Sequence, residues 1–457
     1  MLSDTICALA TAAAPSGIGI IRISGEDAVE IASRFLRKKN GAVLSIAESH
    51  RIKYGFVYDE GRAVDEVLVM TMRAPRSFTG EDTVEIDCHG GVLLTQRVLE
   101  LAVRHGARPA EPGEFTKRAF LNGRIDLSEA EAVSDLISAS NSEALRLSAE
   151  QLRGSVSGKI RELRARILED DAFIEAALDD PEHISMEGFS DALSDHVREL
   201  LRELSALLDS AEDGRYIREG VKTVILGKPN AGKSSLLNML LGEERAIVTD
   251  VAGTTRDTLE EQITLKGISL RIIDTAGIRE TEDRVERIGV ERALKTAESA
   301  DLLIYVADGS RELEESDERI LDFIRDRRAL VLLNKSDLVQ CIREDLLRQR
   351  TSAPILSISA KQGIGIDALS EQIRKMFYHG ELRFRSGLVI TNVRHKQLLM
   401  NARDALREVL HSIELGLPED FYTIDLMRAY AELGYILGEE VSEDLVNEIF
   451  SKFCMGK

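Results

Sequence analysis

Alternating and β-branched runs in the first 120 residues predict a segment that mixes strands and helices. The expected strands are residues 18–23, 51–58, 64–72 and 84–88. The sequence Asp-Glu-Gly-Arg at 59–62 fits a hairpin turn between the second and third of these strands. Apolar residues then recur at helical spacing over 92–104. His89 is expected to lie in a turn or in the core.

From residue 127 the hydrophobic pattern becomes helical. Ser128-Glu129-Ala130-Glu131 has the form of a capping box, and it opens a helical pattern that continues to Leu152. Further helices are expected over 157–178 and 189–212, and after residue 379 over 391–413, 420–437 and 442–453. No strand is expected between 127 and 212.

Strands and helices alternate between residues 222 and 377. The predicted strands are 222–226, 269–273, 302–306, 330–333 and 355–358. They are short and apolar throughout, as expected of strands buried on both faces of a parallel sheet. Because helical segments precede and follow this unit, we interpret it as an α/β domain inserted into a helical one.

The expected fold class is therefore a multidomain α+β chain. It has an N-terminal α/β domain, an α-helical domain in two parts, and an inserted α/β domain whose parallel-rich sheet carries helices on both faces. The N-terminal domain is expected over residues 1–119. The two helical parts are expected over 120–215 and 380–457, and the inserted domain over 216–379.

Charge and composition limit the possible partners. The chain of 457 residues has 59 Lys and Arg against 79 Asp and Glu, a net charge of −20, which argues against general nucleic-acid coating and anionic membranes. Residues 1–124 hold 16 basic and 16 acidic residues, so the negative charge belongs to the rest. Four scattered cysteines and the absence of a long apolar run suggest a cytoplasmic chain without membrane association.

A phosphate-binding loop follows the first strand of the inserted domain. Residues 227–234 read Gly-Lys-Pro-Asn-Ala-Gly-Lys-Ser, between a predicted strand and a predicted helix. The glycines allow backbone amides to surround phosphates, Lys233 supplies charge, and the Ser234 hydroxyl can hold Mg²⁺. The following helix adds the positive end of its dipole.

Three further motifs end successive strands. Asp274-Thr275-Ala276-Gly277 provides a carboxylate for Mg²⁺ and an amide that senses a γ-phosphate. In Asn334-Lys335-Ser336-Asp337, the Asp337 carboxylate can accept from guanine N1–H and from the exocyclic amine of guanine, and adenine lacks both of these donors. Ser359-Ala360-Lys361 is expected to close over the base. Four motifs in this order indicate a GTPase domain that binds GTP and GDP.

The segment between the first two motifs contains a switch candidate. It reads Thr249-Asp250-Val251-Ala252-Gly253-Thr254-Thr255-Arg256-Asp257. Thr255 is the candidate Mg²⁺ ligand, with Thr254 and Thr258 as alternatives.

Position 278 departs from signalling GTPases. Ile278 stands where they place a Gln that orients the attacking water. Asn230 could instead hold a monovalent cation beside the phosphates, and any acid within 279–286 could position water.

These motifs, with others outside the GTPase segment, resemble the MnmE (TrmE) family of tRNA-modifying GTPases over essentially the whole chain. The supporting sequences are Gly-Ile-Ile-Arg-Ile-Ser-Gly at 19–25, Ser-Phe-Thr-Gly-Glu-Asp at 77–82, His-Gly-Gly at 89–91, residues 108–123, and Cys-Met-Gly-Lys at 454–457. The resemblance implies a homodimer joined through N-terminal domains that bind 5-formyl- or 5,10-methylene-tetrahydrofolate. It also implies a heterotetramer with an FAD-dependent MnmG-type subunit, and modification of the wobble uridine of certain tRNAs at C5.

The resemblance also implies roles for residues. Nucleotide contacts fall to Asn230, Ala231, Gly232, Lys233, Ser234, Ser235, Thr249, Asp250, Val251, Ala252, Gly253, Thr254, Thr255, Asp274, Thr275, Ala276, Gly277, Asn334, Lys335, Asp337, Ser359, Ala360 and Lys361. K⁺ falls to Asn230 with Thr249, Val251 and Thr254, and Mg²⁺ to Ser234 and Thr255. The catalytic set is Glu286 as the water-positioning acid, Asn230, Lys233 and Cys454.

Folate contacts fall to Arg22, Glu85, Arg124 and Lys457. The cations suit the carboxylates of a glutamate tail, and Glu85 suits the amino-pyrimidine edge of a pterin. The alternative function is a ribosome-assembly or translation GTPase that acts as an RNA-binding switch without base chemistry. Such a protein is expected to carry a basic appendage, but residues 378–457 show no basic enrichment.

Overall fold

The computed structural model describes residues 4–243, 261–273, 297–378, 388–454 and 456. The chain forms two compact units. The first consists of Met1–Ile137, Ala149–Ser185 and Leu417–Lys457, and the second of Ser138–Ser148 and Met186–Gly416. Each unit combines one sheet with helices contributed by separate parts of the sequence. Among the described residues, no helix is both long enough and apolar enough to cross a membrane.

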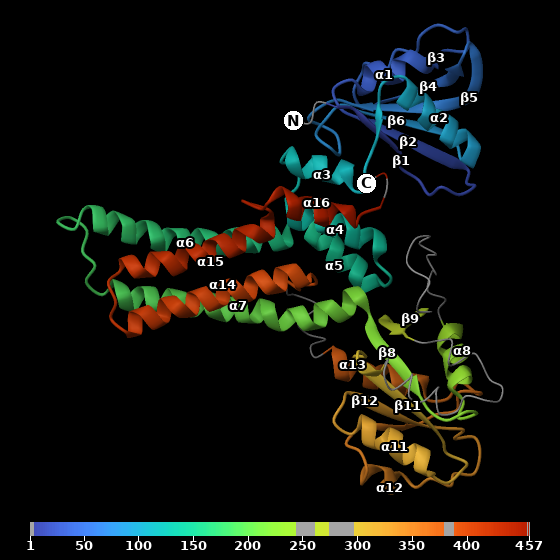
Figure 1. Ribbon diagram of the computed structural model, residues 1–457, viewed down its shortest axis with the longest axis vertical. Helices are drawn as coiled ribbons and strands as arrows, with labels where there is room; N and C mark the ends of the chain where they lie inside the picture. Colours follow the sequence, from blue (N-terminus) through green and yellow to red (C-terminus); the bar gives the residue numbers. More distant parts are fainter. Residues whose placement is uncertain (1–3, 244–260, 274–296, 379–387, 455, 457) are drawn as a thin grey trace. The chain divides into compact units, whose positions relative to one another are not determined.

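A seven-stranded sheet forms the N-terminal part of the first unit, in the order β3-β4-β5-β6-β2-β1-β7. Its strands are β1 (Ile6–Leu9), β2 (Ile18–Ser24), β3 (Leu36–Arg37), β4 (Arg51–Asp59), β5 (Arg62–Met72), β6 (Thr83–His89) and β7 (Arg108–Pro109). All neighbours pair antiparallel except β1 and β7. Helices α1 (Ala28–Phe35) and α2 (Val92–Arg104) pack against this sheet through a common apolar core (Figure 1).

The predicted hairpin is confirmed. Strands β4 and β5 pair through Asp59 and Arg62, and the two turn residues Glu60 and Gly61 have φ of 47° and 79°. Two successive positive φ values match the twist of a tight hairpin. His89 is neither in a turn nor in the core, since it ends β6 with an exposed ring.

Helices make up the rest of the first unit. They are α3 (Glu114–Leu121), α4 (Leu127–Ser138), the end of α5 (Ser142–Leu152), α6 (Ser155–Asp179), α15 (Asp420–Leu437) and α16 (Glu443–Ser451). Helices α6 and α15 run side by side although about 250 residues separate them (Figure 1). Arg164 on α6 joins them by donating to the carbonyl of Tyr430 and pairing with Glu439 at 2.6 Å.

The predicted capping box at 128–131 is shifted. Ser128 lies fully buried inside α4, and the reciprocal bonds belong to Asp126 and Glu129. The Asp126 amide donates to Glu129 Oε2 and the Glu129 amide donates to Asp126 Oδ1, both at 3.0 Å. A carboxylate therefore caps this helix two residues before the predicted position.

The second unit joins two long helices to a six-stranded sheet. Helices α7 (Phe189–Glu219) and α14 (Val393–Glu414) lie side by side, and α7 leads directly into the first strand (Figure 1). The sheet has the order β13-β12-β11-β8-β10-β9, with β8 (Val221–Leu226), β9 (Glu261–Leu265), β10 (Ile268–Ile272), β11 (Leu302–Asp308), β12 (Ala329–Asn334) and β13 (Ile355–Ser357).

This sheet is parallel-rich, as predicted. Only β9 pairs antiparallel, at the edge. Ile304 and its alternate neighbours face a core shared with α8 (Lys233–Glu243) and α13 (Ile366–Phe377), whereas Tyr305 faces a core shared with α11 (Glu315–Ile324) and α12 (Glu344–Arg348). Helices thus cover both faces, which explains why these strands are apolar throughout.

Candidate functional site

Three of the four predicted nucleotide motifs meet at the carboxyl-terminal edge of the second sheet. Gly227 follows β8, Asp308 ends β11, Asn334 ends β12 and Ser359 follows β13. Because these four strands are parallel neighbours, their carboxyl ends lie together, the usual position of a ligand in an α/β sheet.

The loop over residues 227–232 requires its glycines. A Cβ on Gly227 would lie 2.5 Å from the Val306 carbonyl oxygen, and one on Gly232 would lie 2.0 Å from the Asn334 side chain. Gly227, Asn230 and Gly232 have φ of 149°, 62° and 102°. Such left-handed turns direct successive amides toward a common point and create an anion-binding concavity.

Lys233 begins α8 and turns its ammonium group back onto this loop. Its Nζ donates to the carbonyl oxygens of Gly227 and Lys228 at 2.7 and 2.8 Å. Burial lowers the pKa of Lys233. Its position at the helix N-terminus, above the glycine loop, matches what a phosphate group needs.

The base motif is linked to the phosphate loop. Asn334 donates to the Ala231 carbonyl at 2.8 Å and accepts from the Ala360 amide at 3.0 Å. Ser359 Oγ donates to Asp337 Oδ1 at 2.6 Å, and this bond lowers the pKa of Asp337. The structure therefore brings three of the predicted motifs together, with Asp337 ionised and its orientation fixed.

Part of the predicted nucleotide site falls on residues that the structure leaves undescribed. These are Thr249, Asp250, Val251, Ala252, Gly253, Thr254, Thr255, Asp274, Thr275, Ala276, Gly277 and Glu286. Their assignments stay predictions. Ser234 and Ser235 lie in the first turn of α8, and Lys361 follows Ala360.

The predicted folate residues lie on the first sheet and beside it. Arg22 on β2 and Glu85 on β6 are cross-strand partners, and Arg22 Nε donates to Glu85 Oε1 at 2.7 Å. The guanidinium of Arg22 lies 5.9 Å from the ring centre of Phe78, and that of Arg124 lies 5.3 Å from the same ring. Two of the four residues therefore lie against one aromatic ring, and a third, Glu85, is paired with one of them.

The C-terminal residues reach this cluster. The Gly456 carbonyl accepts from Arg22 at 3.3 Å, and the Cys454 carbonyl accepts from the Gly113 amide at 3.4 Å. Cys454 is exposed, and Lys457 lies outside the described residues. In contrast, burial raises the pKa of the Cys7 and Cys88 thiols to about 12 and about 11, which makes them unreactive.

The sequence analysis did not predict the aromatic rings of the first cluster. Phe78 and Phe115 both lie against Arg22, the latter at 5.5 Å. Phe78 stands in the Ser-Phe-Thr-Gly-Glu-Asp motif at 77–82, so its sequence signal was present. The acids at the end of β11 and the start of α11 were also missed, although Asp308 accepts from Lys335 at 2.6 Å.

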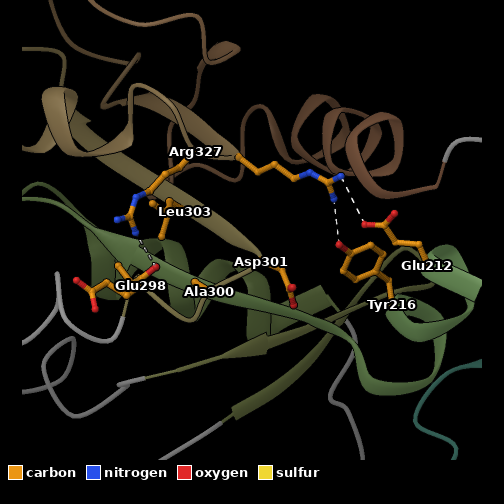
Figure 2. Close-up of a pocket in the computed structure, with 9 residues that line it drawn as sticks. Glu212, Tyr216, Glu298, Ala300, Asp301, Leu303 and Arg327 are labelled. Atoms are coloured by element: carbon orange, nitrogen blue, oxygen red, sulfur yellow. Dashed lines mark hydrogen bonds and ion pairs between the residues drawn. The ribbon is translucent and has the colours of Figure 1, made fainter. Parts of the chain in front are cut away.

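A polar cavity of about 390 Å³ opens at the opposite end of the second sheet, where α7 enters it (Figure 2). Tyr216 and Glu212 on α7 line it together with Asp301, which precedes β11 (Figure 2). Arg328 donates to the Tyr216 hydroxyl at 3.0 Å, and Arg215 pairs with Asp301 at 2.8 Å. These pairs fasten α7 to the sheet.

Comparisons with known proteins match both ends and the middle of the chain. The family model described as the N-terminus of the GTP-binding protein TrmE matches residues 5–124, and that of the MnmE helical domain matches 127–454. A protein from Lachnoclostridium phytofermentans named tRNA modification GTPase MnmE is 56% identical over the whole of both chains. One of the same name from Clostridioides difficile is 48% identical, also over both whole chains.

A solved structure of an Era variant from Aquifex aeolicus, bound to GDP and AlF4−, matches part of the chain. It is 28% identical and covers 40% of this chain and 66% of its own, with a TM-score of 0.27.

Proposed function

The chain belongs to the MnmE (TrmE) family and is a GTPase acting in tRNA modification, and from this premise we propose how its two sites share that work. The proposed function is a K⁺-dependent GTPase that, with an FAD-dependent MnmG-type subunit, adds an aminomethyl or carboxymethylaminomethyl group at C5 of the wobble uridine of certain tRNAs. The observation that carries it is the presence of both a guanine-nucleotide loop and a separate cationic, aromatic cluster in one chain.

The nucleotide part of the proposal rests on loop geometry. The amides of residues 230–233 and the ammonium of Lys233 would hold the phosphates, and Asp337 would accept from the guanine edge. Ser234, in the first turn of α8, would hold Mg²⁺ together with Thr255. Bound Mg²⁺ neutralises phosphate charge during hydrolysis.

The monovalent-cation part rests on Asn230. Its side chain is exposed on the phosphate loop, and its positive φ holds the residue in a strained turn. We assign K⁺ to this side chain and to the carbonyls of Thr249, Val251 and Thr254, and the water-positioning role to Glu286. K⁺ would supply positive charge where position 278 lacks a polar side chain.

The folate part rests on charge and ring contacts. Arg22 and Arg124 would bind carboxylates, Glu85 would accept from a pterin edge, and the Phe78 ring would support a planar group. Lys457 would add a further cation. Bound tetrahydrofolate supplies a one-carbon unit. The salt bridge between Arg22 and Glu85 orients both groups before any ligand binds.

Homodimerisation is supported by the face of the first sheet that lies opposite α1 and α2. Ile52, Tyr54 and Leu68 are large apolar side chains exposed on neighbouring strands, with Tyr54 and Leu68 directly paired. A contiguous exposed apolar stripe of this kind is typical of an interface.

The four-segment domain division, with boundaries after 119, 215 and 379, is proposed on the same basis as the family assignment.

Mass spectrometry of nucleosides from total tRNA tests the function. A strain lacking the chain is compared with strains complemented by the unaltered chain, by Arg22→Ala, or by Arg34→Ala, which removes exposed contacts with Glu30 and with the His105 carbonyl. We expect loss of a C5-aminomethyl-type uridine, its return with the unaltered and Arg34→Ala chains, and its absence with Arg22→Ala. An unchanged nucleoside profile in the deletion strain would favour the RNA-binding switch instead.

A further inference from the structure

A buried carboxylate lies behind the phosphate loop. Asp317, in the first turn of α11, is 4% exposed, and Tyr305 on β11 is fully buried beneath it. Tyr305 donates its hydroxyl to Asp317 Oδ1 at 2.7 Å, and the Glu314 amide donates to Oδ2 at 2.9 Å. Two neutral donors therefore fix the orientation of this carboxylate.

The remaining partner of Asp317 comes from the phosphate loop itself. Lys228 Nζ lies 2.6 Å from Asp317 Oδ2 and 3.1 Å from Glu314 Oε2. Burial opposes the charge of this ammonium, but the bonds to Asp317 and Glu314 raise the pKa of Lys228 above its ordinary value. Lys228 therefore remains a cation and neutralises the buried carboxylate.

The backbone of Lys228 contacts the predicted phosphate-binding lysine. Its carbonyl oxygen accepts from Lys233 Nζ at 2.8 Å. Lys228 thus contacts α11 with its side chain and Lys233 with its carbonyl oxygen. The Lys233 ammonium has three N–H donors, so it can keep the Gly227 and Lys228 carbonyls and still donate to a phosphate oxygen, provided that the loop keeps its shape.

We propose that Lys228 and Asp317 are positioning residues that hold the phosphate loop in its nucleotide-binding shape. The inference rests on the proposed GTP binding at this loop. Neither side chain is required to touch the nucleotide, because the ion pair acts through the backbone of residues 227–232. Without it, the loop samples other shapes, and affinity falls in proportion to the fraction that stays competent.

Variants of the full chain test this role. Lys228→Met removes the charge and keeps the apolar stem, Lys228→Arg keeps the charge, and Asp317→Asn keeps the shape of the acceptor. Glu314→Gln is the matched control, because this second acid contacts the same ammonium from a side chain that is 67% exposed. The probes are GDP binding by calorimetry and GTP turnover as separate KM and kcat.

We expect Lys228→Met and Asp317→Asn each to raise the Kd for GDP and the KM for GTP roughly tenfold, with kcat changed less than about twofold. The double variant should be no weaker than either single one, because both remove the same contact. Lys228→Arg should restore most of the affinity, and Glu314→Gln should change it less than about twofold.

Unchanged affinity in Lys228→Met, additive losses in the double variant, or a fall in kcat at constant KM would overturn the inference. If Asp317→Asn does not fold, Lys228→Met and Lys228→Arg decide the question, since Lys228 lies on a loop. A chain without any GDP binding in its unaltered form would refute the proposed function, and the positioning role with it.

Discussion

At the scale of single residues, Asp337 determines which base the proposed site accepts. Its carboxylate receives the Ser359 hydroxyl on Oδ1, which leaves Oδ2 for a ligand. Guanine presents two N–H donors to such an acceptor. An Asn at this position would present an amide donor in place of one oxygen, and this donor suits the additional carbonyl of xanthine.

We therefore expect Asp337→Asn to lower GTP affinity by a factor of roughly 10⁴ and to raise XTP affinity by a comparable factor. Competition of GTP and XTP for a fluorescent nucleotide measures both constants. Ser359→Ala is the control, since it removes the hydroxyl that orients Asp337 and leaves the base preference unchanged. Equal losses of GTP and XTP affinity in Asp337→Asn would contradict the assignment.

Two histidines of the first sheet domain are expected to titrate in opposite directions. The hydrogen bond that the exposed His89 ring donates to the Asp65 carboxylate raises the pKa of His89 above its ordinary value of 6.5. Burial against Phe35, with nearby arginines, lowers the pKa of His105 below the same value. The stabilising effect of the His89 pair is therefore present below pH 6.5 and is lost as the pH rises through the raised pKa.

Nuclear magnetic resonance titration of the imidazole protons checks this prediction. We expect the His89 midpoint above 6.5 and the His105 midpoint below it, and Asp65→Asn should return only His89 toward 6.5. A His89 midpoint that does not respond to Asp65→Asn would show that the ion pair has no effect on it.

At the scale of elements, hydrophobic periodicity was sufficient to predict a helix or strand that packs against the core along its whole length. The expected helix over 92–104 is α2, residue for residue, and all five strands expected in the second sheet are present within one or two residues of their ends. Strand β1 was missed because its four residues carry no alternation, and it is defined by pairing with β2 and β7. Antiparallel β9 was also missed, although its apolar residues Ile263 and Leu265 alternate with polar ones, and it is defined by pairing with β10.

One break in a helix also escaped the pattern. The helical spacing continues from 127 to 152, but the chain divides it into α4 and α5. Asn141 explains the division, since its side chain accepts from the Ala144 amide at 2.8 Å and donates to the Ile217 carbonyl at 2.9 Å. The second of these bonds joins residues 76 positions apart, which no local pattern reveals.

The same limit applied to the candidate sites. The sequence motifs located each loop of the nucleotide site, because each motif is a contiguous run. They did not reveal that Phe78 lies under both Arg22 and Arg124, or that Lys228 reaches Asp317. These pairings depend on which elements become neighbours, and that depends on the whole fold.

Two helical glycines should respond oppositely to the same substitution. A Cβ on Gly214 of α7 would lie 2.1 Å from the Ile390 carbonyl oxygen, whereas one on Gly158 of α6 would have no neighbour within 4 Å. Gly214→Ala is expected to destabilise the fold by roughly 1–3 kcal/mol because backbone must shift. Gly158→Ala should stabilise it by about 0.5–1 kcal/mol through helix propensity. Urea unfolding followed by circular dichroism measures both, and equal effects would show that α7 does not approach residue 390 closely.

At the scale of the whole molecule, the charge distribution decides how anionic ligands are held. A net charge of −20 repels phosphates at long range, and residues 1–124 are neutral overall. Binding of nucleotide, and of the proposed folate and tRNA ligands, would then depend on a few local cations, such as Lys233 and Arg22. Small cations in solution therefore affect this protein more than they would a basic one.

The proposed K⁺ requirement is one case in which a small cation affects this acidic protein. Asn230 lies exposed on the phosphate loop with a φ of 62°, and the proposed K⁺ ligands are its side-chain amide and backbone carbonyls. We expect GTP turnover at matched ionic strength to be at least several-fold faster in KCl than in NaCl, because the smaller, more strongly hydrated Na⁺ would fit such carbonyl and amide ligands less well. Steady-state phosphate release in the two salts measures the ratio, and Asn230→Ala should bring it close to one. Equal rates in both salts for the unaltered chain would exclude a K⁺-selective site, and a ratio that survives Asn230→Ala would place that site elsewhere.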